Sequence, residues 1–199
     1  MYKLWDTPLL HACETGNRIA VETATGAEVN AEWNGYTPLM VASERNHPKV
    51  VKQLLEKGAT LKSTKACAPP NWKPHAWNAM HVAADLENTE ALEILIDAFP
   101  GSLDMVNGKG NTALCLAASE GHVKAVMLLV ANGANAHAGS HTALQYARDG
   151  GFKKIEHILC SDPGPWRRAE QAKRRFLCKA KEGMTEKELM KLWCDAFRI

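Results

Sequence analysis

Thr37-Pro38-Leu39-Met40-Val41-Ala42 is the stretch that decides the fold, because its pattern occurs five times in the chain. In each copy a threonine or asparagine precedes apolar and small residues, and an alanine closes the hexapeptide. The copies are Thr7–Ala12, Thr37–Ala42, Asn78–Ala83, Thr112–Ala117 and Thr142–Ala147. Their starts lie 30, 41, 34 and 30 residues apart, so one structural unit recurs along most of the chain.

Each unit is predicted to form two helices. Threonine before proline favours a helix start, because the hydroxyl can cap the helix and proline needs no amide partner in the first turn. Small residues such as Ala42 then follow at helical spacing. The second helices carry apolar stripes in Val50–Leu55, Leu92–Ile96 and Val126–Val130, and Gly58 and Gly133 are expected to end them in the left-handed conformation. One helix pair cannot bury its apolar face, whereas a stack of pairs can.

The hexapeptides and their spacing resemble the ankyrin repeat, whose signature is T-P-L-H-x-A with a period of about 33 residues. Asn46-His47 and Gly121-His122 match the start of its second helix, and residues 26–31 match its closing segment. The resemblance covers about residues 5–159. It implies an all-α-dominated solenoid of helix-turn-helix repeats with β-hairpin fingers. It also implies a protein–protein interaction module or adaptor, and not an enzyme.

Two places depart from the family pattern. The first repeat has no leucine run after Asn17, so its second helix is expected to lose about half a turn. Residues 60–77 add about eight residues to the family spacing and contain three prolines within six positions, which cannot form a helix. In this insertion Trp72 and Trp77 either fold back over the solenoid edge or protrude as contacts for a partner.

The resemblance also indicates where a partner would bind, because the family uses a concave face made of fingers and first helices. The corresponding residues here are Glu32, Trp33, Asn34, Tyr36, Glu44, Arg45, Asp85, Leu86, Lys109, Asn111, Ser119, Glu120, His137 and His141. Asn34-Gly35 is a turn dipeptide, so Trp33 and Tyr36 are expected to flank a tight tip. An exposed aromatic pair there is the preferred hot spot, and simple packing within the finger is the alternative.

Two further roles are implied by the family. The rings of His47 and His122 are expected to form hydrogen bonds between repeats. Asn30 lies where some ankyrin proteins resemble substrates of an asparaginyl hydroxylase, although the same asparagine commonly holds its turn by side-chain hydrogen bonds.

Composition and motifs favour no catalytic, cofactor or metal chemistry. The chain is 46% hydrophobic and 23% charged with a net charge of +2, which is typical of an ordinary globular protein. It contains no G-x-S-x-G, P-loop, H-E-x-x-H or glycine-rich dinucleotide motif. Cys67 and His75 make only two candidate zinc ligands.

Location is predicted from the cysteines and the apolar segments. No stretch approaches the roughly 20 apolar residues that cross a bilayer, and no secretory signal is expected at the amino terminus. The six scattered cysteines are expected to be reduced thiols, because a chain of this size needs no disulfides. These features predict a cytoplasmic protein, with the nucleus as the alternative, that is monomeric or part of a hetero-complex.

Residues 160–199 form a separate predicted unit, a basic amphipathic pair of helices over Trp166–Glu182 and from Thr185 onward. This tail has ten Lys and Arg against six Asp and Glu. Three roles are open: a cap on the last repeat with solvated charges, a docking element of a regulatory or inhibitory subunit, or a contact with nucleic acid or an anionic membrane.

Overall fold

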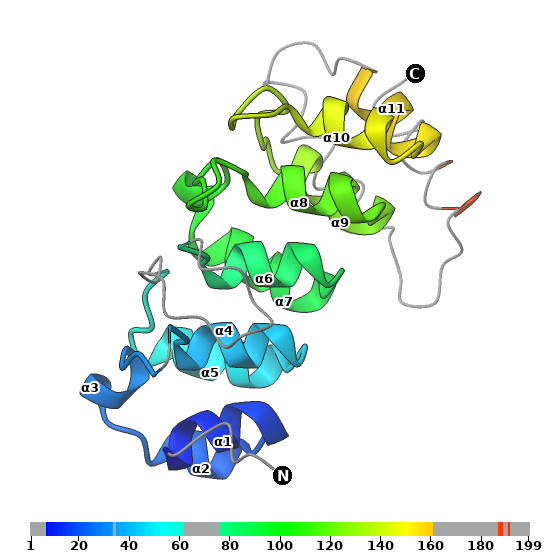
Figure 1. Cartoon of the computed structure of the whole chain (residues 1–199). Helices are drawn as coiled ribbons and strands as arrows, with labels where there is room; N and C mark the ends of the chain where they lie inside the picture. Colours follow the sequence, from blue (N-terminus) through cyan, green and yellow to red (C-terminus); the bar gives the residue numbers. More distant parts are fainter. Residues whose placement is uncertain (1–6, 34, 62–75, 161–186, 189–190, 192–199) are drawn as a thin grey trace, which may run out of the picture.

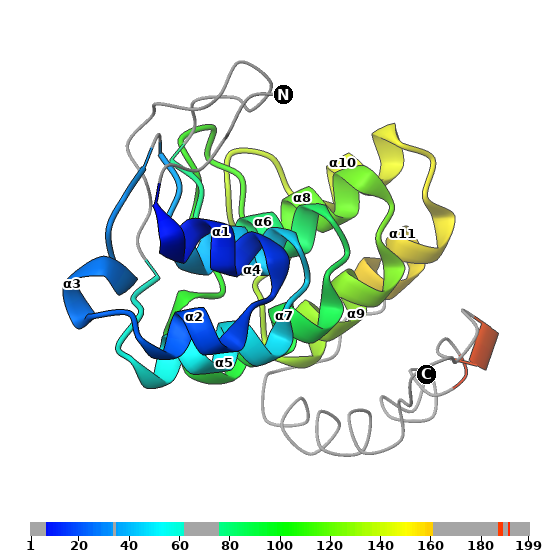
Figure 2. The same cartoon turned by 90° about the horizontal axis from the view of Figure 1, so that it is seen from below.

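The computed structural model describes residues 7–33, 35–61, 76–160, 187–188 and 191. Along these residues five helix pairs stack into an extended solenoid of two layers (Figure 1 and Figure 2). The first layer contains α1 (Pro8–Thr15), α4 (Pro38–Glu44), α6 (Ala79–Asp85), α8 (Ala113–Glu120) and α10 (Ala143–Asp149). The second layer contains α2 (Arg18–Glu22), α5 (Pro48–Glu56), α7 (Thr89–Ala98), α9 (Val123–Ala131) and α11 (Lys153–Cys160). Each helix packs on its counterpart in the next pair, as the repeat pattern predicted.

The five first helices begin in the same way. The Thr7 hydroxyl oxygen accepts a hydrogen bond from the Leu10 amide at 3.4 Å. Four further residues cap their helices with the same bond to the amide three positions later, namely Thr37, Asn78, Thr112 and Thr142. Pro8 and Pro38 occupy the first turn. The helix starts predicted from the hexapeptides are therefore confirmed.

A continuous apolar core runs between the two layers. The alanines that close the five hexapeptides are buried, and so are Cys13 and Cys115 on the same faces. Small side chains let neighbouring first helices approach closely, while leucines such as Leu54, Leu92 and Leu129 fill the second layer. Gly58 and Gly133 end α5 and α9 with φ of 86° and 94°, the left-handed conformation expected of them.

The fingers are loops rather than the strands of β-hairpins in the described part of the chain. One antiparallel bridge joins Trp33 and Tyr36, whose amides each donate to the other's carbonyl oxygen at 2.9 Å. Gly35 lies between them with φ of 81°, as a two-residue tip requires. Ahead of this tip lies a short helix that was not expected, α3 (Gly26–Val29), and the η1 turn (Pro100–Ser102) precedes the third finger.

The first repeat is shortened more than the sequence suggested. Helix α2 has 5 residues and α5 has 9, a loss of four residues, which is about one full turn instead of half a turn. The physical reason is a competing helix start at Thr25, whose amide and hydroxyl donate to a carboxylate oxygen of Glu28 at 2.8 and 2.9 Å. Helix α3 therefore begins at Gly26, the position at which α5 and α9 end, and residues 23–25 lead into α3 instead of continuing α2.

The tail can be compared with its prediction at three positions only. Lys187, Glu188 and Lys191 are helical, within the second helix expected there. The predicted helix Trp166–Glu182, most of the insertion at 60–77 and Trp72 lie outside the described residues, as do Cys67 and His75, the weak zinc pair.

Candidate protein-binding surface

Hydrogen bonds between repeats hold the ends of the first helices in a row. A ring nitrogen of His47 donates to the Glu14 carbonyl oxygen at 3.0 Å, and one of His122 donates to the Asp85 carbonyl oxygen at 2.8 Å. The bonds expected of His47 and His122 are thus present. Because these carbonyls have no partner within their own helices, the bonds satisfy helix ends and fix the spacing between neighbouring repeats.

Two further residues, one at each remaining junction, also hold neighbouring repeats together and were not predicted, Asn88 by hydrogen bonds and Phe152 by packing. The side-chain amide of Asn88 donates to the backbone carbonyl oxygens of Ser43 and Glu44 at 2.8 Å each, which joins the second and third repeats. At the last junction the Phe152 ring lies so close to Gly121 that a side chain there would clash with it. Both residues occupy the sequence position of His47, immediately before a second helix, and that register is the signal that could have identified them.

The side chains at these helix ends are the predicted partner contacts. Arg45, Leu86 and Glu120 are exposed, and Glu44, Asp85 and Ser119 are half-buried. Leu86, which directly follows α6, is 42% exposed. The first-helix layer therefore presents a mainly acidic row with one apolar side chain in the third repeat.

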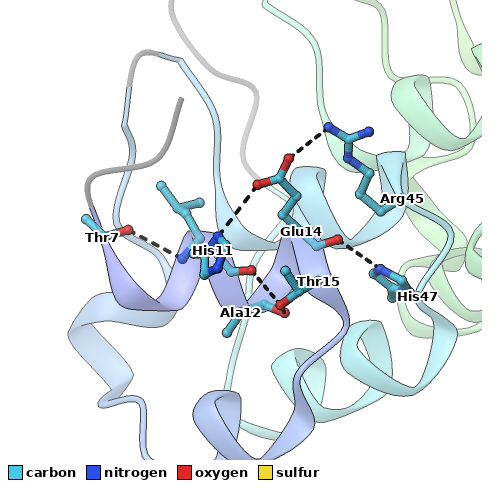
Figure 3. Close-up of polar contacts among 8 residues, drawn as sticks. Thr7, His11, Ala12, Glu14, Thr15, Arg45 and His47 are labelled. Atoms are coloured by element: carbon cyan, nitrogen blue, oxygen red, sulfur yellow. Dashed lines mark hydrogen bonds and ion pairs between the residues drawn. The ribbon is translucent and has the colours of Figure 1, made fainter. Parts of the chain in front are cut away.

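The junction between the first two repeats carries an ionic cluster (Figure 3). The Glu14 carboxylate lies 3.1 Å from the Arg45 guanidinium and 3.8 Å from a ring nitrogen of His11. Figure 3 also shows His47 bound to the backbone carbonyl of Glu14. The backbone of Glu14 thus joins two repeats, while its carboxylate belongs to the ionic cluster. Burial raises the pKa of the neighbouring Glu44. The positive charge of Arg45 partly offsets this rise, and the negative charge of Glu14 adds to it.

The aromatic pair at the first finger is corrected by the structure. Trp33 is 36% exposed, whereas Tyr36 is 5% exposed and belongs to the core. Burial, together with the charge of Glu44, raises the pKa of the Tyr36 hydroxyl to about 12. Tyr36 directly precedes Thr37, the buried cap of α4, and therefore enters the core with the start of that helix. Asn34, the remaining predicted residue of this tip, lies outside the described residues.

The third finger also corrects one prediction. Asn111 is 8% exposed, and its side-chain oxygen accepts a hydrogen bond from the Tyr146 hydroxyl at 3.0 Å. Its amide donates to the Asn107 side chain, which closes the loop from inside. Lys109 is exposed on this loop. Asn111 therefore supports the finger and is removed from the predicted surface.

Three other predicted contacts can be placed. His137 and His141 are exposed on the loop before α10, and the His141 ring lies 5.8 Å from the Tyr146 ring. Trp77 is half-buried and packs against the core, 6.3 Å from the His81 ring. Of the two readings of Trp77, the structure supports folding back over the solenoid edge.

Asn30 ties the first finger to the end of α5. Its side-chain nitrogen donates to the Gly58 carbonyl at 2.9 Å, and its side-chain oxygen accepts from the Thr60 amide and hydroxyl at 2.9 Å each. Asn30 therefore holds its turn by side-chain hydrogen bonds.

His81 is the most strongly perturbed titratable group of the solenoid. One ring nitrogen accepts from the Asn78 amide at 3.2 Å, and the other donates to the Met105 carbonyl at 3.0 Å. These partners require the neutral ring. Burial accordingly lowers the pKa of His81 to about 4, against the smaller effect of the backbone hydrogen bonds.

A groove at the amino-terminal end was missed by the sequence reasoning. It has a volume of about 320 Å³ and lies between the starts of α1 and α4, the end of α2 and the first finger. Apolar residues line most of it, with Trp33 at its edge, and two carboxylates, Glu28 and Glu32, also face it. Only the tertiary arrangement joins these segments, so no local pattern indicated the groove.

The described part of the chain holds no group of three metal-ligating side chains. Among the helices that the structure describes, none is long and apolar enough to span a membrane.

Helix pairs that stack side by side along one axis, with hydrogen bonds between neighbouring pairs, define an α-solenoid repeat protein. A family model of ankyrin repeats in three copies matches residues 3–65 and 80–167, and the chain belongs to the ankyrin-repeat family. Ankyrin repeats generally mediate protein–protein interaction and are typically not enzymes.

Curated relatives share the repeats. The mitochondrial disaggregase of Bos taurus is 31% identical over 160 residues, which are 75% of this chain and 22% of that protein. Ankyrin repeat and SOCS box protein 11 is 30% identical over 126 residues in both Homo sapiens and Pongo abelii, covering 62% of this chain and 36% of the relative. The chain thus spans well under two thirds of the relatives it matches.

Proposed function

We propose that this chain is an adaptor that binds a partner protein through the first-helix layer and its fingers. The observation that carries the proposal is the exposure of two large apolar side chains, Trp33 and Leu86, at the finger and first-helix positions that the family uses. Tryptophan is enriched among interface hot spots, and Trp33 lies exposed in a finger where it can serve as one.

The charges of the surface suggest the chemistry of the partner. Among the candidate residues Glu32, Glu44, Asp85 and Glu120 are acidic and Arg45 and Lys109 are basic, a balance of −2 with histidines left aside. A complementary partner presents apolar side chains flanked by lysine or arginine. Charge complementarity of this kind raises the association rate and selects among partners.

Two other predictions belong to the same proposal. The division of the chain at residue 159 and cytoplasmic residence remain predictions. Docking through the tail, or contact of the tail with nucleic acid, depends on residues that lie largely outside the described part.

The test uses the full chain and one matched control. A partner is first identified from nuclease-treated lysate by crosslinking and mass spectrometry, and its Kd is then measured with purified proteins by calorimetry. Trp33→Ala and Leu86→Ala are each expected to weaken binding, Trp33→Ala by about 2 kcal/mol, or roughly 30-fold in Kd. The control is Ile19→Ala, because Ile19 is 77% exposed on α2 in the opposite layer.

Equal affinity of wild type, Trp33→Ala and Leu86→Ala would contradict the proposal. A steep loss of affinity with salt in all variants, together with binding to duplex DNA or RNA alone, would favour the nucleic-acid role of the tail.

A further inference from the structure

The amino-terminal groove is continuous with the surface proposed to bind a partner. Trp33 lines one part of it, and Pro38 at the start of α4 lines another. Trp33 is also the exposed aromatic side chain of the first finger. A partner segment that contacts Trp33 therefore lies beside the groove, and the lining of the groove selects what that segment carries.

The walls of the groove favour an apolar side chain. Most of its lining residues are apolar, and they include Pro8 and Ala31, which are exposed, and Ala24, which is half-buried. The volume of about 320 Å³ lies at the small end of the range of about 300–1,000 Å³ for ligand pockets. This size suits one or two large apolar side chains of a partner.

Two carboxylates give the groove a negative charge. Glu28 and Glu32 are the charged residues of its lining, and both are exposed. The Thr25 amide and hydroxyl both donate to Oε2 of Glu28, at 2.8 and 2.9 Å, so Oε1 is left to accept from a ligand. These bonds lower the pKa of Glu28, so its carboxylate is ionised at neutral pH.

The described part of the chain does not neutralise this charge. No ion pair joins Glu28 or Glu32 to a cation among the described residues. Lys57 reaches this region, but its ammonium group donates to the carbonyl oxygens of Glu22 and Ala24, at 2.6 and 3.1 Å. Lys57 is not among the lining residues. A cation supplied by the ligand therefore complements the groove.

Building on the proposed adaptor function, we propose that the groove receives a large apolar side chain of the partner, flanked in the partner's sequence by arginine or lysine. The apolar side chain packs between α1, the end of α2 and the first finger, beside Trp33. The flanking cation pairs with the carboxylates of Glu28 and Glu32. Arginine suits this role best, because its guanidinium group can bind a carboxylate through two hydrogen bonds.

The test titrates the full-length, nitrogen-15-labelled protein with a capped pentapeptide, Gly-Arg-Leu-Arg-Gly. The readout is the nuclear magnetic resonance signal of the Trp33 indole N–H, which is assigned by its loss in Trp33→Phe. A saturable shift is expected, with a Kd on the order of millimolar for so small a ligand. Two matched peptides, one with glutamates for the arginines and one with glycine for the leucine, are expected to give no saturable shift.

The carboxylates are tested by Glu28→Gln combined with Glu32→Gln. This double variant is expected to bind the arginine peptide roughly threefold to tenfold more weakly, since each exposed ion pair contributes modestly. Glutamine can replace Glu28 in the capping box of α3, so the fold is retained. The matched control is Glu90→Gln, which makes the same change of charge at an exposed position of α7 and is expected to bind like wild type.

Three results would each overturn the inference: no saturable shift with the arginine peptide, equal binding of the arginine and glutamate peptides, or equal binding by wild type and the double variant. Failure of the adaptor proposal looks different, because it concerns the intact partner. If Trp33→Ala and Leu86→Ala weaken binding of that partner but no peptide shifts the Trp33 signal, the adaptor surface stands and the groove is not its pocket. Leu86→Ala is expected to bind the arginine peptide like wild type, because Leu86 does not line the groove.

Discussion

The first and third repeats each place a histidine in the same hexapeptide, and its position within the motif decides what it does. His81 is the fourth residue of its copy and is 1% exposed, with both ring nitrogens bonded. His11 is the fifth residue of its copy, and its side chain is 68% exposed. One residue along a helix turns a side chain by about 100°, enough to move it from the core to the surface. A motif residue must therefore be assigned by register and not by identity.

The same two repeats differ in their second helices, and the largest expected effect tests that difference. Leu95 and Ala24 are equivalent positions, each seven residues after the asparagine that precedes the second helix. Leu95 is fully buried in the third repeat, whereas the first repeat has only an alanine there. Leu95→Ala is expected to lower the free energy of unfolding by about 3–4 kcal/mol, through lost burial and a cavity. Urea unfolding followed by circular dichroism measures it, with Leu86→Ala as the exposed control in the same repeat. A loss below about 1 kcal/mol would show that the third repeat repacks as freely as the first.

The next prediction concerns pH and the buried histidine. The pKa of His81 is about 4 in the folded chain and about 6.5 in the unfolded chain. As the pH falls from 6.5 to 4, the unfolded chain takes up a proton that the folded chain refuses, so stability is complete above pH 6.5 and decreases through this window. The loss of folding free energy attributable to His81 is at most about 3.4 kcal/mol, from about 2.5 pKa units at 1.36 kcal/mol each. Urea midpoints between pH 7.5 and pH 4 measure it in wild type and in His81→Gln.

The variant separates His81 from the carboxylates that also titrate in that range. His81→Gln is expected to be less stable at pH 7.5 but to have a shallower pH dependence. Parallel pH profiles for the two proteins would disprove the assignment of His81 as a neutral buried ring.

Asn30→Ala tests the attachment of the first finger to the second repeat. The substitution removes three hydrogen bonds at a half-buried site. It is therefore expected to lower the free energy of unfolding by about 1–2 kcal/mol. The readout is hydrogen exchange of the Thr60 amide, which is expected to accelerate while amides in α6 keep their rates. Unchanged exchange at Thr60 would mean that the finger is held by packing alone.

The smallest expected effect concerns Arg45 at the ionic cluster. Arg45→Ala is expected to change the free energy of unfolding by less than about 0.5 kcal/mol, since its pair with Glu14 is exposed and screened by salt. Thermal unfolding at low and high salt measures this change. A larger loss would make Arg45 a structural residue of the first junction and would weaken its assignment to the binding surface.

The sequence predicted what depends on local pattern and missed what depends on loop geometry. Helix starts, buried alanines and the ring bonds of His47 and His122 follow from motif register. Tyr36 and Asn111 could not be placed, because finger side chains point inward or outward according to turns that no periodicity records. The amino-terminal groove joins four separate segments, so it becomes visible only when the chain is folded.

The bonds at the starts of the second helices share a direction. At each of the first three junctions the donor lies on the later repeat, His47, Asn88 or His122, and the acceptor is a carbonyl at the end of the earlier first helix. During synthesis the acceptor thus leaves the ribosome before its donor. Each later repeat therefore supplies the bonds that complete the first helix of the repeat before it.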